Sequence, residues 1–165
     1  MPGVMRHLIA ALVVVSAASA APSAGVLVAR GNWAALDFGT RCEARSKALW
    51  ARSGTEPYLG FAFEAGGRRN GQFYVHLSRP PRAGASVIAT LGATPFLLSA
   101  RGEWAWSTSA NQQRSILEAA RYAQSMKVDS RDQRGRRIVD RYSLSGAPTA
   151  IDSAAAACAG KTQRQ

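Results

Sequence analysis

The sequence is short of the residue types that most often perform catalysis or bind metals. It has two histidines, two cysteines and ten acidic residues among 165 positions. It lacks the G-x-S-x-G and S-x-x-K spacings of common serine nucleophiles, and it has no glycine-rich phosphate loop. A zinc site would have to use both cysteines, because only His76 follows the predicted signal peptide. We therefore expect no catalytic residue, metal or cofactor, and an enzyme is the least favoured class.

Two weaker possibilities for chemistry stay open. His76 lies on the outward side of a predicted strand, where a solvated surface residue is a commoner role than a general base. Four glutamates lie among the predicted strands, and two of them could face each other as in glycoside hydrolases, although surface ion pairs are the favoured interpretation: Glu43, Glu56, Glu64 and Glu103.

Asp140 shares a face with apolar residues, and we expect it to be partly buried and paired with an arginine such as Arg121.

The first twenty residues have the pattern of a secretory signal peptide. Arg6 precedes an apolar run, residues 8–15, and Ala18-Ser19-Ala20 supplies the small residues of a cleavage site. The apolar run is too short to span a membrane. We expect cleavage after about Ala20, a periplasmic or secreted protein, and no transmembrane segment in the mature chain.

Export changes the interpretation of the cysteines. In an oxidising compartment an even number of cysteines favours a disulfide, so we predict a bond between Cys42 and Cys158. Two buried free thiols are the alternative.

Positive charge is in large excess, with a formal net charge of +11. Such an excess fits an anionic partner, although compositional bias towards arginine is the favoured explanation, because the arginines are scattered along the chain. The densest group lies in a predicted hairpin and is our candidate for contact with anions, with a plain solvated hairpin as the alternative: Arg131, Arg134, Arg136, Arg137 and Arg141.

Alternating polar and apolar residues predict several short strands. Residues 38–48 alternate in this way, and Cys42 falls on the inward face. Further strands are predicted at 58–65, 72–78, 86–92, 95–100, 103–107, 126–131 and 137–144. The tryptophans, Trp33, Trp50, Trp104 and Trp106, fit core positions, but joint exposure of Trp104 and Trp106 would favour a carbohydrate or partner surface.

Two helices are predicted late in the chain, at about 109–125 and 148–159. Ser109 and Gln112 form a capping box at the first, and the second places Ile151 and Cys158 on one apolar face. The predicted fold is mainly β with two helices, an antiparallel sandwich or barrel in a single domain. The expected organisation is a signal peptide at 1–20, a linker or edge strand at 21–31, one β-rich domain at 32–160, and a disordered tail at 161–165.

The segment YSLSG at residues 142–146, followed by APTAI at residues 147–151, resembles the end of invasion-associated locus B family proteins. The early Trp33…Cys42 segment and the run SMKVDSRDQRGRRIVDRYSLSG are also similar, so that the resemblance spans roughly residues 31–160. The chain departs from the family in having two cysteines where members often have more. The resemblance implies an exported bacterial β-rich protein of a family associated with entry into host cells, and it supplies no catalytic residues.

Two binding functions follow as expectations. The first is a non-enzymatic envelope protein that binds another, unknown envelope or host component. The alternative is a basic protein that contacts an anionic surface, either lipopolysaccharide or nucleic acid.

Overall fold

The computed structural model describes residues 24–51, 55–67 and 69–162. The predicted signal peptide lies outside these residues. The described chain forms ten strands and two helices in the order β1 (Gly25–Arg30), β2 (Trp33–Asp37), β3 (Arg41–Lys47), β4 (Tyr58–Glu64), β5 (Asn70–His76), β6 (Val87–Leu91), β7 (Thr94–Arg101), β8 (Trp104–Trp106), α1 (Ala110–Tyr122), β9 (Ser125–Arg131), β10 (Arg137–Ser143) and α2 (Ala147–Thr162).

All ten strands belong to one antiparallel sheet with the order β1-β2-β3-β4-β5-β8-β7-β6-β9-β10. The sheet curls, so that the Leu49 N–H, just after β3, donates to the Arg141 carbonyl in β10 over 2.7 Å. The Trp33 Nε1–H likewise donates to the Ser143 carbonyl over 2.8 Å. The predicted fold class, mainly antiparallel β with two helices, is confirmed. The choice left open between a sandwich and a barrel is answered by a single curled sheet that does not close.

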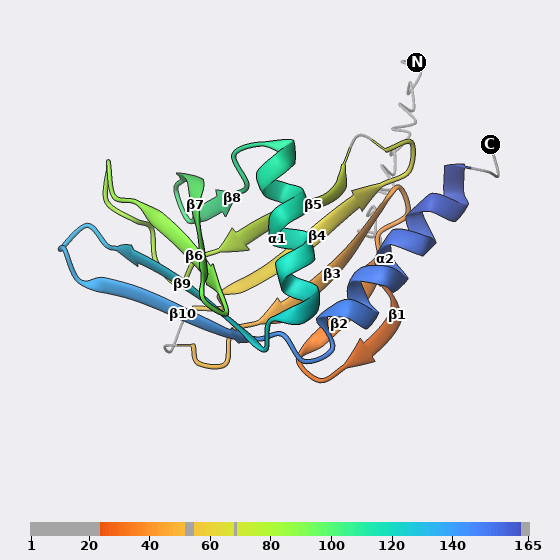
Figure 1. Cartoon of the computed structure of the whole chain (residues 1–165), viewed down its shortest axis with the longest axis horizontal. Helices are drawn as coiled ribbons and strands as arrows, with labels where there is room; N and C mark the ends of the chain where they lie inside the picture. Colours follow the sequence, from red (N-terminus) through yellow and green to blue (C-terminus); the bar gives the residue numbers. More distant parts are fainter. Residues whose placement is uncertain (1–23, 52–54, 68, 163–165) are drawn as a thin grey trace, which may run out of the picture.

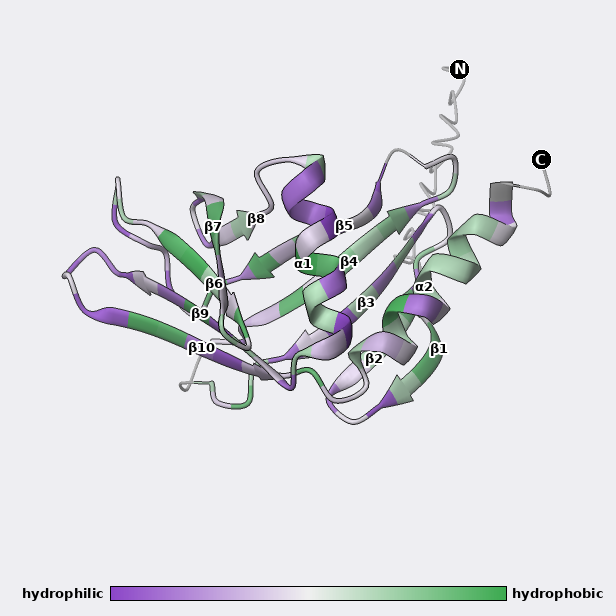
Figure 2. Ribbon diagram, in the orientation of Figure 1, coloured by the Kyte–Doolittle hydropathy of each residue, from purple (hydrophilic) through white to green (hydrophobic). Residues whose placement is uncertain are grey.

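Both helices lie across the same face of the sheet, which we call the inner face (Figure 1). In β3 the buried residues Cys42, Ala44 and Ser46 point to this face. Along β10 every second residue is buried, and Ile138 and Tyr142 are fully so. Figure 2 shows the hydrophobic band of this strand between hydrophilic stretches. Period-two patterning therefore places one continuous core between the sheet and the helices. The opposite side of β2–β5 and β8 is covered by neither of the two described helices and is called the outer face.

The helix α1 begins where the sequence predicted. The Ser109 side chain accepts a hydrogen bond from the Gln112 N–H over 3.2 Å, as in a capping box. The helix ends at Tyr122 rather than near residue 125, because Ala123 takes an extended conformation. Ser125 and Met126 are used instead by β9, where they pair with Ser143 and Tyr142 of β10.

The helix α2 follows Gly146, whose φ of +94° is a conformation that favours glycine. A Cβ at this position would lie 2.3 Å from the Arg30 carbonyl oxygen, so Gly146 also allows the chain to pass close to the end of β1. Ile151 and Cys158 are buried on the face that packs against the sheet. The helix continues to Thr162. Lys161 is therefore helical and not part of a disordered tail starting at residue 161; residues 163–165 lie outside the described part of the chain.

The residues predicted as a linker or edge strand, 21–31, include β1. This strand forms one edge of the sheet, pairs with β2 alone, and exposes Val26 and Leu27. Neither helix found in the described residues is long and apolar enough to cross a membrane.

Candidate functional site

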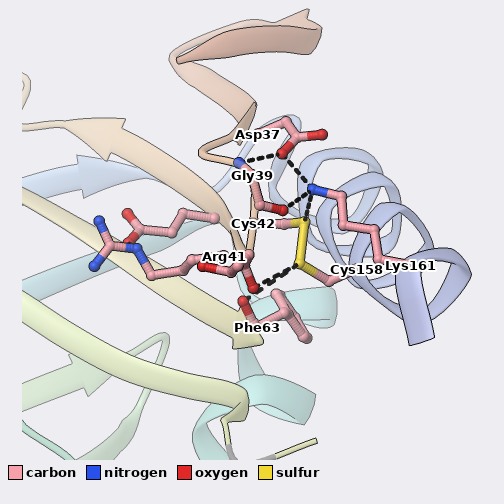
Figure 3. The surroundings of a disulfide bond; sticks show 9 residues. Asp37, Gly39, Arg41, Cys42, Phe63, Cys158 and Lys161 are labelled. Atoms are coloured by element: carbon pink, nitrogen blue, oxygen red, sulfur yellow. Dashed lines mark hydrogen bonds and ion pairs between the residues drawn. A yellow bond between two sulfur atoms is a disulfide. The ribbon is translucent and has the colours of Figure 1, made fainter. Parts of the chain in front are cut away.

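The predicted disulfide is confirmed. Cys42 on the inner face of β3 and Cys158 on the buried face of α2 are bonded, with their Cα atoms 5.8 Å apart (Figure 3). Both cysteines are buried, and the alternative of two free thiols is excluded. The bond joins positions 116 residues apart and so fixes the last helix to the early part of the sheet.

Lys161, in the last turn of α2, lies over this disulfide (Figure 3). Its Nζ is 3.6 Å from Cys42 Sγ, and it donates hydrogen bonds to the Asp37 carboxylate and to the Gly39 carbonyl. The hydrogen bond from Lys161, together with one from the Gly39 N–H, lowers the pKa of Asp37 below its usual value. The end of α2 is thus held to the β2–β3 turn by an ion pair as well as by the disulfide.

The five arginines of the predicted anion site lie at the β9–β10 hairpin, but they do not converge on one point. Arg137 is paired with Asp129 and Arg136 with Asp132. Arg131 donates to the Gly135 carbonyl over 3.0 Å. Within the described residues, the side chains of Arg134 and Arg141 make no ion pair, and both are exposed.

The turn of this hairpin is organised around Asp132, whose structural role the sequence did not indicate. Asp132 is buried and accepts hydrogen bonds from the backbone N–H groups of Arg134 and Arg136. It also forms an ion pair with Arg79, which comes from the connection between β5 and β6. Burial alone would raise the pKa of Asp132, but these hydrogen bonds and the Arg136 guanidinium outweigh it and lower the pKa. Part of the hairpin's positive charge is therefore neutralised by carboxylates of the hairpin itself.

Asp140 is buried as predicted, but its expected pairing with Arg121 is wrong. Asp140 Oδ2 accepts a hydrogen bond from the Ser78 N–H over 2.9 Å. Arg121 instead pairs with Asp152 of α2. Asp140 thus serves the junction between β5 and β10.

The outer face carries an ordered array of side chains that sequence reasoning did not identify as a site. One row crosses five strands through directly paired positions: Lys47, Tyr58, His76, Trp104 and Arg101. The neighbouring row contains Arg45, Gly60, Tyr74 and Trp106 in the same way. Antiparallel register therefore brings aromatic and cationic residues from β3, β4, β5, β7 and β8 together.

A buried carboxylate lies under the second row. Glu43 is 3% exposed, although no helix covers the outer face. Its carboxylate forms an ion pair with Arg41 at 2.7 Å. It also accepts a hydrogen bond from Arg45 and another from the Tyr74 hydroxyl, the latter over 2.5 Å. Burial raises the pKa of Tyr74, and the adjacent Glu43 carboxylate raises it further, so this hydroxyl stays protonated and donates. Buried charges of this kind need such complete pairing.

Gly60 makes room for this arrangement. A Cβ on Gly60 would lie 2.5 Å from the Tyr74 hydroxyl oxygen and 2.8 Å from the Ala44 carbonyl oxygen. The Tyr74 side chain therefore lies over a glycine and reaches Arg45, whose Nε is 2.9 Å from the Tyr74 oxygen.

Beside this network the rings of the first row pack together. The His76 ring is stacked with Tyr58 at a centroid distance of 5.2 Å and packs against Trp104 at 4.8 Å. His76 is on the outer face as predicted, but its ring belongs to this cluster and its side chain is only 25% exposed. Trp104 is 42% exposed, whereas Trp106 is partly buried and Trp33 lies in the core. The joint exposure of Trp104 and Trp106 that would favour a carbohydrate or partner surface is therefore not found, because only Trp104 is exposed.

The array is hollowed in two adjoining places. One hollow, of about 540 Å³, is bordered by Arg101, Trp104 and Tyr74. A second, of about 750 Å³, is bordered by Leu36, Lys47 and Leu49. Arg45 and Tyr58 line both hollows, which we together call the outer-face groove. The groove combines partly exposed rings, hydrogen-bonding side chains and cations, which are the components of a recognition surface.

The sequence does contain a signal for this groove, in the outward positions of the strands. Residues 41, 43 and 45 are Arg, Glu and Arg, and residues 58, 74 and 76 are aromatic. The solvated face of an antiparallel sheet is usually polar, so the three rings are the unusual feature. Strand order, which brings β8 next to β5, could not be read from this pattern. The paired glutamates considered for glycoside hydrolysis are not brought together here: Glu43 is in the network described above, Glu64 pairs with Arg69, and Glu103 lies beside His76.

The described residues contain no group of three or more His, Cys, Asp or Glu side chains placed to hold a metal ion. The resemblance to invasion-associated locus B proteins stays a prediction from short motifs. No family model, no curated protein and no solved structure matches this chain.

Proposed function

We propose that the chain is an exported, non-enzymatic binding protein of the bacterial envelope, similar in role to invasion-associated locus B proteins, and that it binds its partner through the outer-face groove. Export rests on the signal-peptide pattern of residues 1–20 and agrees with a disulfide, which is typical of oxidising compartments. Periplasm or extracellular space is the proposed location.

One observation supports the groove most directly. Trp104 is exposed in the middle of a packed ring cluster, and one of its neighbours, Tyr74, is held by a hydrogen bond to the buried Glu43. Exposed tryptophans held in place by their surroundings are frequent centres of binding energy, because little side-chain freedom is lost when they bind.

The test is binding of the purified chain to bacterial envelope extracts, with Trp104→Ala as the variant and Trp50→Ala as its control. Trp50 is 81% exposed and does not line either hollow, so it matches the loss of an exposed indole. We expect Trp104→Ala to weaken capture by about tenfold and Trp50→Ala to leave it unchanged. Equal capture by both variants, with unchanged thermal stability, contradicts the proposal.

A second candidate function is contact of the β9–β10 hairpin with an anionic surface such as lipopolysaccharide or nucleic acid. The exposed side chains of Arg134 and Arg141, which form no ion pair with any residue that the structure describes, favour it, together with the net charge of +11. Binding through the hairpin would weaken strongly as the salt concentration rises, since exposed charges are screened. Loss of extract binding at high salt and in an Arg134→Ala, Arg141→Ala double variant, with Trp104→Ala unaffected, would assign binding to the hairpin.

A further inference from the structure

The outer-face row ends in a cation on each side. Arg101 follows Trp104 across the β7–β8 pair, and Lys47 faces Tyr58 across the β3–β4 pair. Both side chains are exposed, and neither makes an ion pair or side-chain hydrogen bond within the described residues. Four strand spacings separate the two positions, or about 19 Å. The ends of the row therefore suit two negative charges on one elongated ligand.

Between these cations there is one well-exposed ring. Trp104 is 42% exposed, while His76 and Tyr58 are packed face to face against each other. The flat face of an indole attracts the C–H groups of a sugar ring, and a single indole is enough for one sugar. Single-stranded nucleic acid, by contrast, is bound by a series of rings on which successive bases stack. The arrangement of rings favours a saccharide.

Two acceptors lie near the ring: Glu103 is outside the linings of both hollows, and Gln72 is inside one. Glu103 is 49% exposed, and its Oε2 lies 3.4 Å from His76 Nε2, so its carboxylate is next to the Trp104 cluster. Gln72 lines the hollow near Trp104 and offers both a donor and an acceptor. Carboxylate and amide oxygens accept hydrogen bonds from sugar hydroxyls, and an amide also donates them. These polar groups again favour a hydroxyl-rich ligand.

We propose that the outer-face groove binds an acidic saccharide: one sugar ring stacks on Trp104, its hydroxyls contact Glu103 and Gln72, and its acid groups reach Arg101 and Lys47. The proposal rests on the proposed function and names its ligand class. Carboxylate, sulfate and phosphate groups would all meet these cations, since Arg and Lys bind each of them through charge-assisted hydrogen bonds.

The experiment is isothermal titration calorimetry on the chain purified after expression in an oxidising compartment. The acidic probes are an oligogalacturonate hexasaccharide, a heparin hexasaccharide and the phosphorylated core oligosaccharide of lipopolysaccharide; maltohexaose is the neutral probe and an oligo-dT the nucleic acid. We expect at least one acidic saccharide to bind about tenfold more tightly than maltohexaose and oligo-dT. The acidic probe that binds identifies the acid group.

Matched variants locate the binding. Trp104→Ala and Arg101→Ala should each weaken binding of the acidic saccharide about tenfold, whereas Trp50→Ala and Arg134→Ala should not. No binding by any of the three acidic saccharides, tighter binding of oligo-dT, or equal effects of Arg101→Ala and Arg134→Ala would overturn the proposal. If envelope capture depends on Trp104 but no acidic saccharide binds, the ligand class is wrong and the proposed function stands. If capture does not depend on Trp104, the proposed function fails.

Discussion

The two faces of β3 differ in how they are buried. On the inner face, Cys42 and Ala44 are small, and α2 and the disulfide cover them. On the outer face, Glu43 is buried to a similar degree without any covering helix, because Arg41, Arg45 and Tyr74 enclose it. Neighbouring residues of one strand thus serve packing on one side and an ordered polar surface on the other. The inner face therefore holds the core, and we propose that the outer face serves recognition.

Removal of the disulfide on the inner face should lower the free energy of unfolding more than any change on the outer face. Cys158→Ser opens a loop of 116 residues, and the loop-entropy relation gives a loss of about 4–5 kcal/mol in the free energy of unfolding. We expect the melting temperature to fall by roughly 10–20 °C. Thermal denaturation followed by circular dichroism measures it.

Reductant provides the control for this variant. It should lower the melting temperature of the wild-type chain to near that of Cys158→Ser and leave the variant unchanged. An unaltered melting temperature in Cys158→Ser would mean that α2 is held to the sheet by its packing alone.

Glu43→Gln, on the outer face, should cause the next largest loss in the free energy of unfolding. The substitution leaves two guanidinium groups beside a buried site without their countercharge, which costs about 3 kcal/mol, at the low end for a buried pair because both arginines are partly exposed. Chemical denaturation measures the loss.

Glu64→Gln is the matched control. Glu64 is 25% exposed and pairs with Arg69 alone, so its loss should cost about 0.5 kcal/mol or less. Similar losses in both variants would show that the outer face is an ordinary solvated surface.

Gly60→Ala should disturb the outer face through shape alone. The new methyl group would meet the Tyr74 hydroxyl and the Ala44 carbonyl, and only the side chain can move away. We expect a loss of about 2 kcal/mol from overpacking, with Tyr74 displaced from Glu43.

Gly160→Ala is the matched control for Gly60→Ala. Gly160 lies in α2 with no atom within 4 Å of the added Cβ, so the change should be neutral or slightly stabilising. If Gly60→Ala were as well tolerated in chemical denaturation, the close approach of Tyr74 would not matter to the fold.

Acid should weaken the inner-face attachment of α2 to a smaller extent. The pKa of Asp37 is lowered in the folded state by the hydrogen bond from Lys161. A lowered folded pKa contributes stability at pH values above the unfolded pKa, about 4, and this contribution is lost as the pH falls through the folded pKa. Melting temperatures measured from neutral pH down to about pH 2 should therefore fall less steeply in Asp37→Asn than in the wild type. Parallel curves would remove Asp37 from the acid response.

Much of the inner face could be predicted from the sequence. Alternation along β3 placed Cys42 inward, the apolar face of α2 placed Cys158 inward, and export then predicted their bond. The capping residues Ser109 and Gln112 located the start of α1. Each of these follows from local patterns that do not depend on how distant strands are ordered.

The outer face could not be predicted in the same way. Its array depends on β8 lying next to β5, and nothing local to Trp104 or His76 indicates that they are paired. The arginine hairpin was located by its composition, but its charge is partly used by Asp129 and Asp132, whose ion pairs only the folded chain shows. Pairing across strands decides which charges are free, and strand order is set by the whole fold.

The most direct test of the outer-face site is the NMR spectrum of the four tryptophan indole N–H groups, assigned by single Trp→Phe variants, during titration with envelope extract. Trp33 donates to the Ser143 carbonyl in the interior and Trp50 is exposed outside the groove, so they serve as internal references. We expect the Trp104 signal to shift most, that of Trp106 to shift less, and those of Trp33 and Trp50 to stay in place. A titration that shifts backbone signals of the β9–β10 hairpin and leaves Trp104 unmoved would contradict the outer face as the binding surface.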